Sequence, residues 1–531
     1  MATNADLIVA TLRAAGIDAG FGIPSGNVIP LIEAMRQGGM RFVLTAHEGS
    51  AAFAADVTGR MTGRPGLCIA THGPGATNLT TGVGCALLDR SPMIALTCNI
   101  PTAQLGRRVQ MHIPHHDLFA PITKASLPLR GGGVGATVAE ALRIALSEPP
   151  GPVHLDLPED VAVAETAEPV PAIPPPSGVA AAPAASLDEA ARLVARARRP
   201  IAVIGASAMR LREPDRLRRF VERHAMPFAS TTMAKGLIDE DHPLSLGCIE
   251  RARRQVQRAF LRGADLIVGL GYDPVEVEYE AWIGEVPLLH IDSARADTDG
   301  SVRIAHEVAG DLDASLGALI EGRAAAVAWT PEAIAAHRAH FQSSLRPRVG
   351  AFAPHQAIDV VREVLPRDGI LAFDVGAHTH QIASQWHAHA PRSFLITNGW
   401  SSMGFGLPAA IAAKRARPDL PVVCLIGDGC FQMTCGELAM AKRERLALPV
   451  VVLDDRWLAL IKVKQERRAY PYFGTALDAA PPPAHYFGVP AVAADNAAAL
   501  EDALRRALAS AGPTVIEAIV DAAHYSETVY D

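Results

Sequence analysis

The chain has 531 residues, of which 49% are apolar and 20% are charged, and its formal net charge is −7. This length predicts about three domains with sizeable apolar cores. The acidic balance disfavours a nucleic-acid-binding protein, and no uninterrupted apolar run reaches the roughly 18 residues of a membrane span.

The N-terminal segment and the cysteines indicate a cytoplasmic enzyme rather than an exported protein. Residues 1–20 lack the basic region and cleavage site of a secretory signal, and predict an amphipathic helix that ends at Gly16. The 7 cysteines include no Cys-x-x-Cys pair, which disfavours a disulfide framework and a zinc site. We therefore expect small-molecule substrates, with neither nucleic acid nor a membrane as a partner.

Three blocks of alternating strands and helices are expected along the chain. A proline- and alanine-rich stretch without apolar periodicity, residues 166–186, predicts an extended linker, and a weaker boundary lies near residues 324–354. The resulting blocks are 1–165, 187–325 and 350–531. Because each block alternates short β-branched runs with helical stretches, the predicted fold is α/β, with three doubly wound parallel-sheet domains.

The predicted strands are short, apolar and bounded by turn residues. They are Arg41–Ala46, Gly66–Ala70, Met93–Thr97, Val153–Leu157, Pro200–Ile204, Leu266–Leu270, Ile370–Phe373, Val422–Ile426, Val450–Leu453 and Thr514–Val520. Ligands of such sheets bind at the carboxyl ends of the strands, so the residues that follow each strand are the first candidates for chemistry.

In the third block, two successive strands end in aspartates. Gly427-Asp428-Gly429-Cys430 follows the first, and Asp454-Asp455-Arg456-Trp457 follows the second. A Gly-Asp-Gly turn ahead of a helix places backbone N–H groups beside a carboxylate, which suits an anion bound together with a cation. Asp428 and Asp455 could then contribute to an octahedral oxygen shell around Mg²⁺. The alternative is a tight turn followed by a helix cap.

The first block contributes a glutamate and a glycine-rich loop. Glu48 lies where a predicted strand passes into the helix Ser50–Met61, and the loop Thr71–Asn78 follows the next strand. Taken alone, Glu48 is explained by the attraction of a helix N-terminus for a carboxylate, and the loop by a left-handed turn.

Taken together and in order, these motifs resemble the thiamine diphosphate (ThDP) enzymes of the acetolactate synthase and pyruvate decarboxylase superfamily. The resemblance rests on His47-Glu48, on Gly73–Asn78 (GPGATN), on Gly404–Ala410 (GFGLPAA) and on the two aspartate motifs, and it spans almost the whole chain. Ala264–Glu276 is similar to the catabolic, FAD-independent acetolactate synthases. The resemblance implies a pyrimidine-binding, a central and a diphosphate-binding domain.

The resemblance also implies which residues meet the cofactor. Glu48 matches the family's glutamate beside the aminopyrimidine ring, Met403 the apolar residue under the bend of the cofactor, and the Ser401 carbonyl an acceptor for its amino group. The remaining matches are the diphosphate and metal positions Gly376, His378, Gly427, Asp428, Gly429, Cys430, Asp455 and Trp457. Of these, Asp428, Asp455 and the carbonyl of Trp457 would bind Mg²⁺.

Two of these positions have a simpler alternative. His378 is implied to meet a phosphate oxygen, and otherwise is a solvated loop histidine. Cys430 is expected to be a small residue of the diphosphate loop rather than a nucleophile, since no histidine stands near it in sequence to activate it.

Around the substrate, the sequence departs from the family. Asn27 replaces a lysine of the catabolic enzymes, and His72 stands at a loop position often occupied by serine. The glutamine of acetolactate synthases is replaced by Met111, with Gln110 one residue earlier. His115 and His116 are either pocket residues or a solvated loop pair. The predicted catalytic residues are Glu48, His72, Gln110, His115 and His116.

The implied function is ThDP- and Mg²⁺-dependent decarboxylation of a 2-oxo acid followed by carboligation, as in acetolactate synthase. FAD is not expected, because Tyr272–Val275 replaces the Arg-Phe-Asp-Asp segment of FAD-bearing relatives. The alternatives are a decarboxylase or C–C lyase that releases an aldehyde, and a non-catalytic subunit that only holds the cofactor. The family's shared sites imply a homodimer or homotetramer with sites at the subunit interface.

Overall fold

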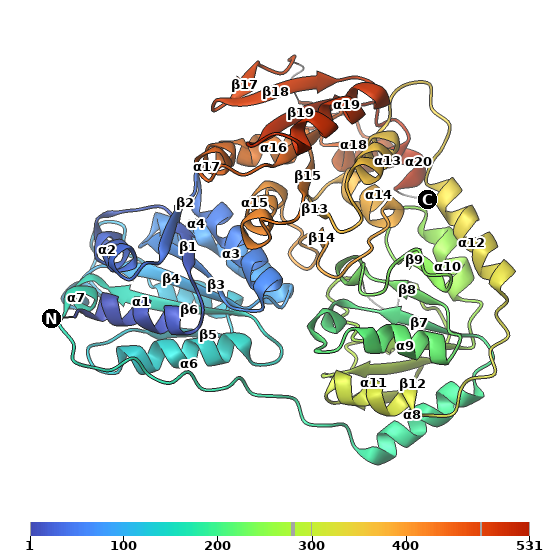
Figure 1. Cartoon of the computed structure of the whole chain (residues 1–531), viewed down its shortest axis with the longest axis horizontal. Helices are drawn as coiled ribbons and strands as arrows, with labels where there is room; N and C mark the ends of the chain where they lie inside the picture. The colour runs from blue at the N-terminus through green and yellow to red at the C-terminus, as the bar shows by residue number, and fades with distance from the viewer. Residues whose placement is uncertain (1, 278–281, 299, 478–479, 530–531) are drawn as a thin grey trace.

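The computed structural model describes residues 2–277, 282–298, 300–477 and 480–529. Within these ranges, three sheets with helices packed against them follow one another along the chain (Figure 1). The strand pairs are parallel except for a short antiparallel hairpin near the C-terminus. The predicted fold class of three parallel-sheet α/β domains is confirmed.

The N-terminal sheet has the strand order β2-β1-β3-β4-β6-β5. Its strands are β1 (Ala19–Gly22), β2 (Arg41–Leu44), β3 (Gly66–Thr71), β4 (Met93–Asn99), β5 (Ala125–Pro128) and β6 (Pro152–Pro158). Its helices are α1 (Asn4–Ala14), α2 (Ile29–Gln37), α3 (Glu48–Thr62), α4 (Pro74–Leu88), α5 (His115–Phe119), α6 (Val134–Leu146) and α7 (Glu159–Val163).

The central sheet has the order β12-β11-β10-β7-β8-β9. Its strands are β7 (Pro200–Ile204), β8 (Phe228–Ser230), β9 (Ser245–Cys248), β10 (Leu266–Leu270), β11 (Leu288–Asp292) and β12 (Ile304–Ala309). The helices are α8 (Ala184–Arg196), α9 (Asp215–Arg223), α10 (Arg254–Leu261), α11 (Leu312–Ile320) and α12 (Pro331–Ser344). Residues 166–183 form no helix or strand and cross from the first domain to α8, which begins inside the predicted linker (Figure 1).

The C-terminal sheet has the order β14-β13-β15-β16-β19-β18-β17. Its strands are β13 (Ile370–Phe373), β14 (Phe394–Leu395), β15 (Val422–Gly427), β16 (Pro449–Asp454), β17 (His485–Tyr486), β18 (Val489–Ala494) and β19 (Thr514–Ile519). The helices are α13 (Pro354–Val364), α14 (Ala377–Gln385), α15 (Gly406–Ala416), α16 (Asp428–Thr434), α17 (Leu438–Arg443), α18 (Ala459–Arg467), α19 (Ala497–Leu508) and α20 (Tyr525–Thr528).

The predicted strands coincide with observed ones, and the main difference has a physical cause. The strand predicted as Arg41–Ala46 ends at Leu44. The N–H groups of Ala46 and His47 donate instead to the carboxylate of Glu437, at 3.0 and 3.1 Å. A side chain from the C-terminal domain therefore ends β2 and sets the path of the chain into α3.

The N- and C-terminal domains share one apolar core. Helix α15 packs against α3 in this core (Figure 1), where Phe53 and Phe405 meet edge to face with ring centroids 5.7 Å apart. Arg60 crosses the same boundary: its guanidinium donates to Asp89 at 2.8 Å and to the Ile396 carbonyl at 2.6 Å. The N- and C-terminal domains, which carry the site residues, are thus joined by an apolar core and by the hydrogen bonds of Arg60.

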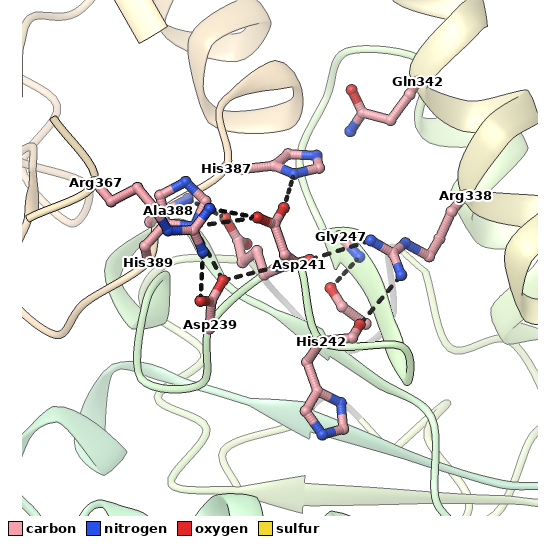
Figure 2. Close-up of polar contacts among 12 residues, drawn as sticks. Asp239, Asp241, His242, Gly247, Arg338, Gln342, Arg367, His387, Ala388 and His389 are labelled. Atoms are coloured by element: carbon pink, nitrogen blue, oxygen red, sulfur yellow. Dashed lines mark hydrogen bonds and ion pairs between the residues drawn. The ribbon is translucent and has the colours of Figure 1, made fainter. Parts of the chain in front are cut away.

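The central and C-terminal domains meet at a cluster of charged side chains, which we call the interdomain ion cluster. It consists of Asp239, Asp241, Arg367, His387 and His389 (Figure 2). Arg367 pairs with Asp239 at 2.7 Å and with Asp241 at 2.8 Å.

Among the described helices, none is both long enough and apolar enough to cross a membrane.

Candidate active site

The two aspartate motifs lie side by side at the carboxyl edge of the C-terminal sheet. Strands β15 and β16 pair in parallel, with Gly427 opposite Leu453. Asp428 bridges the two strand ends: one oxygen accepts from the N–H of Gly429 at 2.7 Å and the other from the N–H of Arg456 at 2.7 Å. The carboxylate of Asp455 accepts from the N–H of Trp457 at 2.9 Å. Sequence-distant carboxylates are thus fixed at one edge.

These two carboxylates form no ion pair with any residue that the structure describes. Burial, followed by the charge of Asp455, raises the pKa of Asp428 to about 8. Burial likewise raises the pKa of Asp455 to about 7, against the hydrogen bond from Trp457. No lysine or arginine of the described residues forms an ion pair with either, and Lys462 lies over the Trp457 ring instead. A hard divalent cation fits this pair of oxygen donors.

His378 lies beside the same edge as a buried side chain with one unpaired ring nitrogen. Its Nε2 has no hydrogen-bond partner in the described part of the chain, and burial lowers its pKa to about 4. Glycines flank the ring on two sides: a Cβ on Gly376 would lie 2.6 Å from the His378 Cε1, and one on Gly427 would lie 2.9 Å from it. An anion held by backbone N–H groups fits this glycine-lined site and would give the imidazole a partner.

Asp374 is a structural element of this site to which the sequence motifs assign no role. It is fully buried, and its carboxylate accepts from the N–H groups of Gly404 at 3.1 Å and Gly406 at 2.9 Å. It therefore ties the end of β13 to the segment before α15. The available signal was an aspartate directly after a buried strand, a position that favours interaction with neighbouring loop N–H groups.

Met403 and Ser401 lie on the segment that Asp374 anchors. Met403 packs against the core shared by the two domains, with its Cε 3.4 Å from the place a Cβ on Gly429 would take. Ser401 is exposed and adopts a left-handed backbone with φ 51°. Such conformations are uncommon outside glycine and concentrate at functional sites. Trp400 docks the segment on α4, where its Nε1 donates to Thr81 at 3.1 Å.

Cys430 is a small buried residue of the α16 turn. Its thiol donates to the carbonyl of Val375 at 3.1 Å, and this hydrogen bond links the start of α16 to the turn before α14. Burial raises the pKa of the thiol well above its usual range, so it is not a thiolate at neutral pH.

Glu48 is the first residue of α3 and is 8% exposed. One carboxylate oxygen accepts from the amide of Asn78 at 3.0 Å, and the other faces Gly75, where a Cβ would lie 3.3 Å from it. The glycine-rich loop therefore supplies both a neutral donor that orients Glu48 and open space beside it. His47 caps the helix, since its Nδ1 accepts from the N–H of Gly49 at 3.0 Å.

The chain matches known families over its whole length. Three family models match in order: the thiamine pyrophosphate enzyme N-terminal TPP binding domain at residues 2–120, the central domain at 187–319, and the C-terminal TPP binding domain at 374–518. The chain is also 30% identical to the acetolactate synthase isozyme 1 large subunit of Escherichia coli, over 99% of this chain and 95% of that protein.

Other relatives agree. The chain is 32% identical to the isozyme 2 large subunit of Escherichia coli, over 87% of this chain and 85% of that protein. It is 31% identical to the chloroplastic acetolactate synthase of Arabidopsis thaliana, over 97% of this chain and 81% of that protein. The chain belongs to this family. It is a ThDP-dependent enzyme of the acetolactate synthase type, as the resemblance predicted.

In this enzyme, the residue in the place of the catabolic lysine supports a histidine. Asn27 donates from its amide to the Nδ1 of His72 at 2.9 Å and to the carbonyl of Cys98 at 2.6 Å. Thr71 fixes the amide by donating to its oxygen at 2.7 Å. Since Nδ1 accepts, His72 carries its proton on Nε2. Burial lowers the pKa of His72, and the charges of His115 and His112 lower it further, so it is a neutral donor at pH 7.

His115 is buried behind the glycine-rich loop, so the alternative of a solvated pair does not hold for it. Its Nδ1 donates to Asp156 at 2.9 Å, and its Nε2 accepts from the N–H of Gly73 at 3.3 Å. His115, His154 and Asp156 cluster as metal ligands do, but the hydroxyl of Thr97 lies among them within 3.0 Å of each. The arrangement is a polar network that holds Gly73.

The other two candidates of this segment lie at the surface. His116 is partly exposed and contacts Ser126 at 2.7 Å through its Nδ1. Gln110 is exposed, and the next residue, Met111, has a left-handed backbone. The carbonyl of Met111 abuts Gly73 so closely that any Cβ at position 73 would clash. The structure thus gathers His72, Gln110 and His115 around one glycine.

The central domain buries a carboxylate at the point where its strand order reverses. Glu276 accepts from the N–H of Ala206 at 3.2 Å, from the N–H of Met233 at 2.8 Å and from the hydroxyl of Thr231 at 2.6 Å. Burial raises its pKa to about 8. Beside it, Tyr272, Asp273 and Asp292 contribute to the lining of a cavity of about 960 Å³. In sheets of this order, a nucleotide phosphate usually takes the place that Glu276 fills.

Proposed function

We propose that the enzyme uses ThDP and Mg²⁺ to decarboxylate a 2-oxo acid and to join the remaining fragment to a second carbonyl compound. The observation that carries this proposal is the pair Asp428 and Asp455, two largely enclosed carboxylates at one edge of the sheet without an ion-pair partner among the described residues. Bound ThDP supplies a nucleophilic carbon that adds to the oxo group and accepts the electrons left behind by CO₂.

The diphosphate end would be held by the C-terminal domain. Asp428, Asp455 and the carbonyl of Trp457 are the proposed Mg²⁺ ligands, in keeping with the preference of Mg²⁺ for oxygen. Gly376, Gly427, Gly429 and Cys430 line the turns whose N–H groups would face the phosphates. His378 would meet a phosphate oxygen with the Nε2 that has no partner in the described chain.

The reactive end would be held between the two domains. Glu48 would hold a proton at the pyrimidine ring, where Asn78 keeps its carboxylate in place. Met403 would support the bend of the cofactor, and the carbonyl of Ser401 would accept from its amino group. These roles agree with the burial of Glu48 and with the anchoring of the Met403 segment by Asp374.

On the substrate side, His72 would donate from Nε2 to an oxygen of the substrate, in place of the backbone of Gln110 with which its ring is hydrogen-bonded. Gln110 and His116 lie at the rim of the same loop, and His115 would act through Gly73. A second candidate function, release of an aldehyde after decarboxylation, is favoured by the same observation, because a histidine beside the reacting carbon can deliver the proton that ends the reaction.

Product analysis separates these functions. The enzyme, with ThDP and Mg²⁺, is incubated with a panel of 2-oxo acids, with and without an added aldehyde or second oxo acid, and CO₂ and organic products are quantified. The carboligase proposal requires CO₂ together with a coupled product. CO₂ with an equal amount of aldehyde establishes the second function. ThDP binding without CO₂ from any substrate would indicate a non-catalytic, cofactor-holding subunit.

We further propose a homodimer or homotetramer in which each cofactor lies between two subunits. Exposed apolar side chains lie on or just after α16 and α18, the helices that follow Asp428 and Asp455. They are Met433, Ile461, Tyr470 and Phe473. Two inactive variants, Glu48→Gln and Asp428→Ala, are mixed under conditions of subunit exchange. Shared sites should restore up to about a quarter of the activity, because one site of each mixed dimer is intact. No recovery despite exchange would show that each chain builds its own site.

We also propose that the enzyme works in the cytoplasm without FAD. The carboxyl group of Glu276 occupies the helix start at which a dinucleotide phosphate would bind, and it takes the backbone N–H group of Ala206 that the phosphate would need. Absence of flavin absorbance in enzyme purified from cells, with unchanged activity after addition of FAD, is the expected result.

A further inference from the structure

Tyr525, the first residue of α20, is a buried tyrosine with an unpaired hydroxyl. The side chain is 1% exposed, and its hydroxyl has no hydrogen-bond partner among the described residues. Buried tyrosine hydroxyls are normally paired, because an unpaired polar atom in the interior destabilises the fold. The hydroxyl therefore lacks an acceptor within the described part of the chain.

The packing of Tyr525 places it against the elements that carry the proposed diphosphate site. It shares a small apolar cluster with Ala377 and Val463. Ala377 stands between Gly376 and His378 at the start of α14, and Val463 lies on α18, the helix that follows the Asp455 motif. Tyr525 thus packs between the turn that contains Gly376 and helix α18.

The position of α20 is fixed from the central domain. The N–H of Arg253 donates to the carbonyl of Thr528 at 2.9 Å, and its guanidinium pairs with Glu527. Arg253 itself has a left-handed backbone, with φ 51°. The short helix is therefore held from outside its own domain, so the orientation of Tyr525 does not depend on the intrinsic stability of four helical residues.

The surroundings make the Tyr525 hydroxyl a donor. Burial raises the pKa of Tyr525 well above its usual range, and the charges of Asp455 and Asp428 raise it further, so the phenol stays protonated. The Nε2 of His378, the residue after Ala377, is likewise buried and has no partner among the described residues. The start of α14, which Tyr525 contacts through Ala377, thus has two buried polar atoms that lack a partner.

We propose that Tyr525 is a further cofactor-binding residue, whose hydroxyl donates a hydrogen bond to an oxygen of the metal-bound diphosphate. This inference rests on the Mg²⁺–diphosphate site of the proposed function. A diphosphate carries more acceptor oxygens than the metal and the helix N–H groups satisfy, and hydrogen bonds to a charged acceptor are the strong ones. Tyr525 would then contact the diphosphate group of the cofactor and not its thiamine rings.

The alternative is that Tyr525 only packs, and Tyr525→Phe separates the two. Phenylalanine keeps the packing and removes the unpaired hydroxyl, so the cofactor-free variant should melt at the same temperature as the parent or higher. The matched control is Tyr486→Phe. It removes a hydroxyl from the same domain that donates to Glu517 at 2.6 Å, so this variant should melt lower and bind ThDP as the parent does.

Calorimetry measures the binding of ThDP and of thiamine to each protein in the presence of Mg²⁺. For Tyr525→Phe, the dissociation constant for ThDP should rise about tenfold, as expected for loss of a hydrogen bond to a charged group, while that for thiamine stays unchanged. Unchanged ThDP affinity, or equal losses for both ligands, overturns the inference. If the parent enzyme itself binds ThDP no better with Mg²⁺ than without it, the metal–diphosphate site fails instead, which is a different outcome.

Discussion

Two pairs of aspartates in this enzyme have opposite electrostatic surroundings. Asp239 and Asp241 lie in the interdomain ion cluster, where Arg367, His387 and His389 gather around them (Figure 2). Asp428 and Asp455 lie at the carboxyl edge of the C-terminal sheet, which we call the diphosphate edge. In the described chain they accept only from backbone N–H groups. The first pair is partly exposed, whereas the second is largely enclosed by the fold.

The pKa values of the two aspartate pairs differ because the pairs have different hydrogen-bond and ion-pair partners. Burial alone would raise the pKa of Asp241, but hydrogen bonds from His387 and Arg367 outweigh it and lower the pKa to about 2. At the diphosphate edge, burial and mutual repulsion raise the pKa of Asp428 to about 8. Since no described residue forms an ion pair with Asp428 or Asp455, our proposal leaves their counter-charge to a ligand. The first pair holds domains together, and the second is the pair that we propose to bind Mg²⁺.

The largest expected effect tests whether a third enclosed carboxylate, Glu48, belongs with the binding pair. Its partner is the neutral amide of Asn78. Glu48→Gln keeps the shape and removes the acid–base function, so turnover should fall by roughly 10²–10⁴, while ThDP affinity stays close to that of the parent. Steady-state kinetics and calorimetry measure the two quantities. Parental turnover would remove Glu48 from the mechanism.

The next effect compares the two aspartate pairs directly. In Asp428→Asn, loss of a metal ligand should weaken Mg²⁺-dependent ThDP binding by roughly 100-fold. The same change relieves repulsion between the carboxylates but replaces one of the two oxygens that accept from Gly429 and Arg456, so ThDP affinity rather than melting temperature separates the two pairs. Asp241→Asn is the matched control, with lower thermal stability and parental ThDP affinity. If both variants lose stability and neither loses affinity, the distinction between the pairs is wrong.

The sequence predicted the binding pair because each aspartate directly follows a strong strand signal. Parallel strands bring such residues to one edge whatever their separation in sequence, so Asp428 and Asp455 could be placed together without a structure. The interdomain ion cluster offered no such signal. Asp239 and Arg367 are joined only by the packing of two domains, which local patterns do not encode.

The roles of residues that act through long-range contacts could not be predicted from the sequence for the same reason. Glu437 ends β2 from another domain, and Tyr525 reaches the diphosphate edge from a short helix with no motif. Asn27 was read as a missing lysine, whereas in the structure it orients His72. Motif positions could be predicted, and the residues that support them depend on how the three domains pack.

Acid should weaken the interdomain ion cluster. Because the folded-state pKa of Asp241 is lowered, its contribution to stability is fully present above the ordinary aspartate pKa of about 4 and is lost as the pH falls towards 2. The urea midpoint of the parent should therefore approach that of Asp241→Asn between about pH 4 and pH 2. Both side chains are partly exposed, so the difference should stay modest. A difference that is independent of pH in this range would contradict the assignment.

The smallest effect is expected at Arg367, which joins both aspartates of the interdomain ion cluster but is itself 61% exposed. Exposed ion pairs contribute little, because water screens the charges and two long side chains lose freedom, so Arg367→Gln should lower the free energy of unfolding only slightly. Salt should shrink this difference further, since screening acts on the exposed pair and not on enclosed groups. Urea midpoints of the parent and the variant are compared at low and at high salt, with ThDP affinity measured alongside. A salt-independent loss, or a loss of ThDP affinity like that of Asp428→Asn, would show that the interdomain ion cluster and the diphosphate edge are energetically coupled rather than separate.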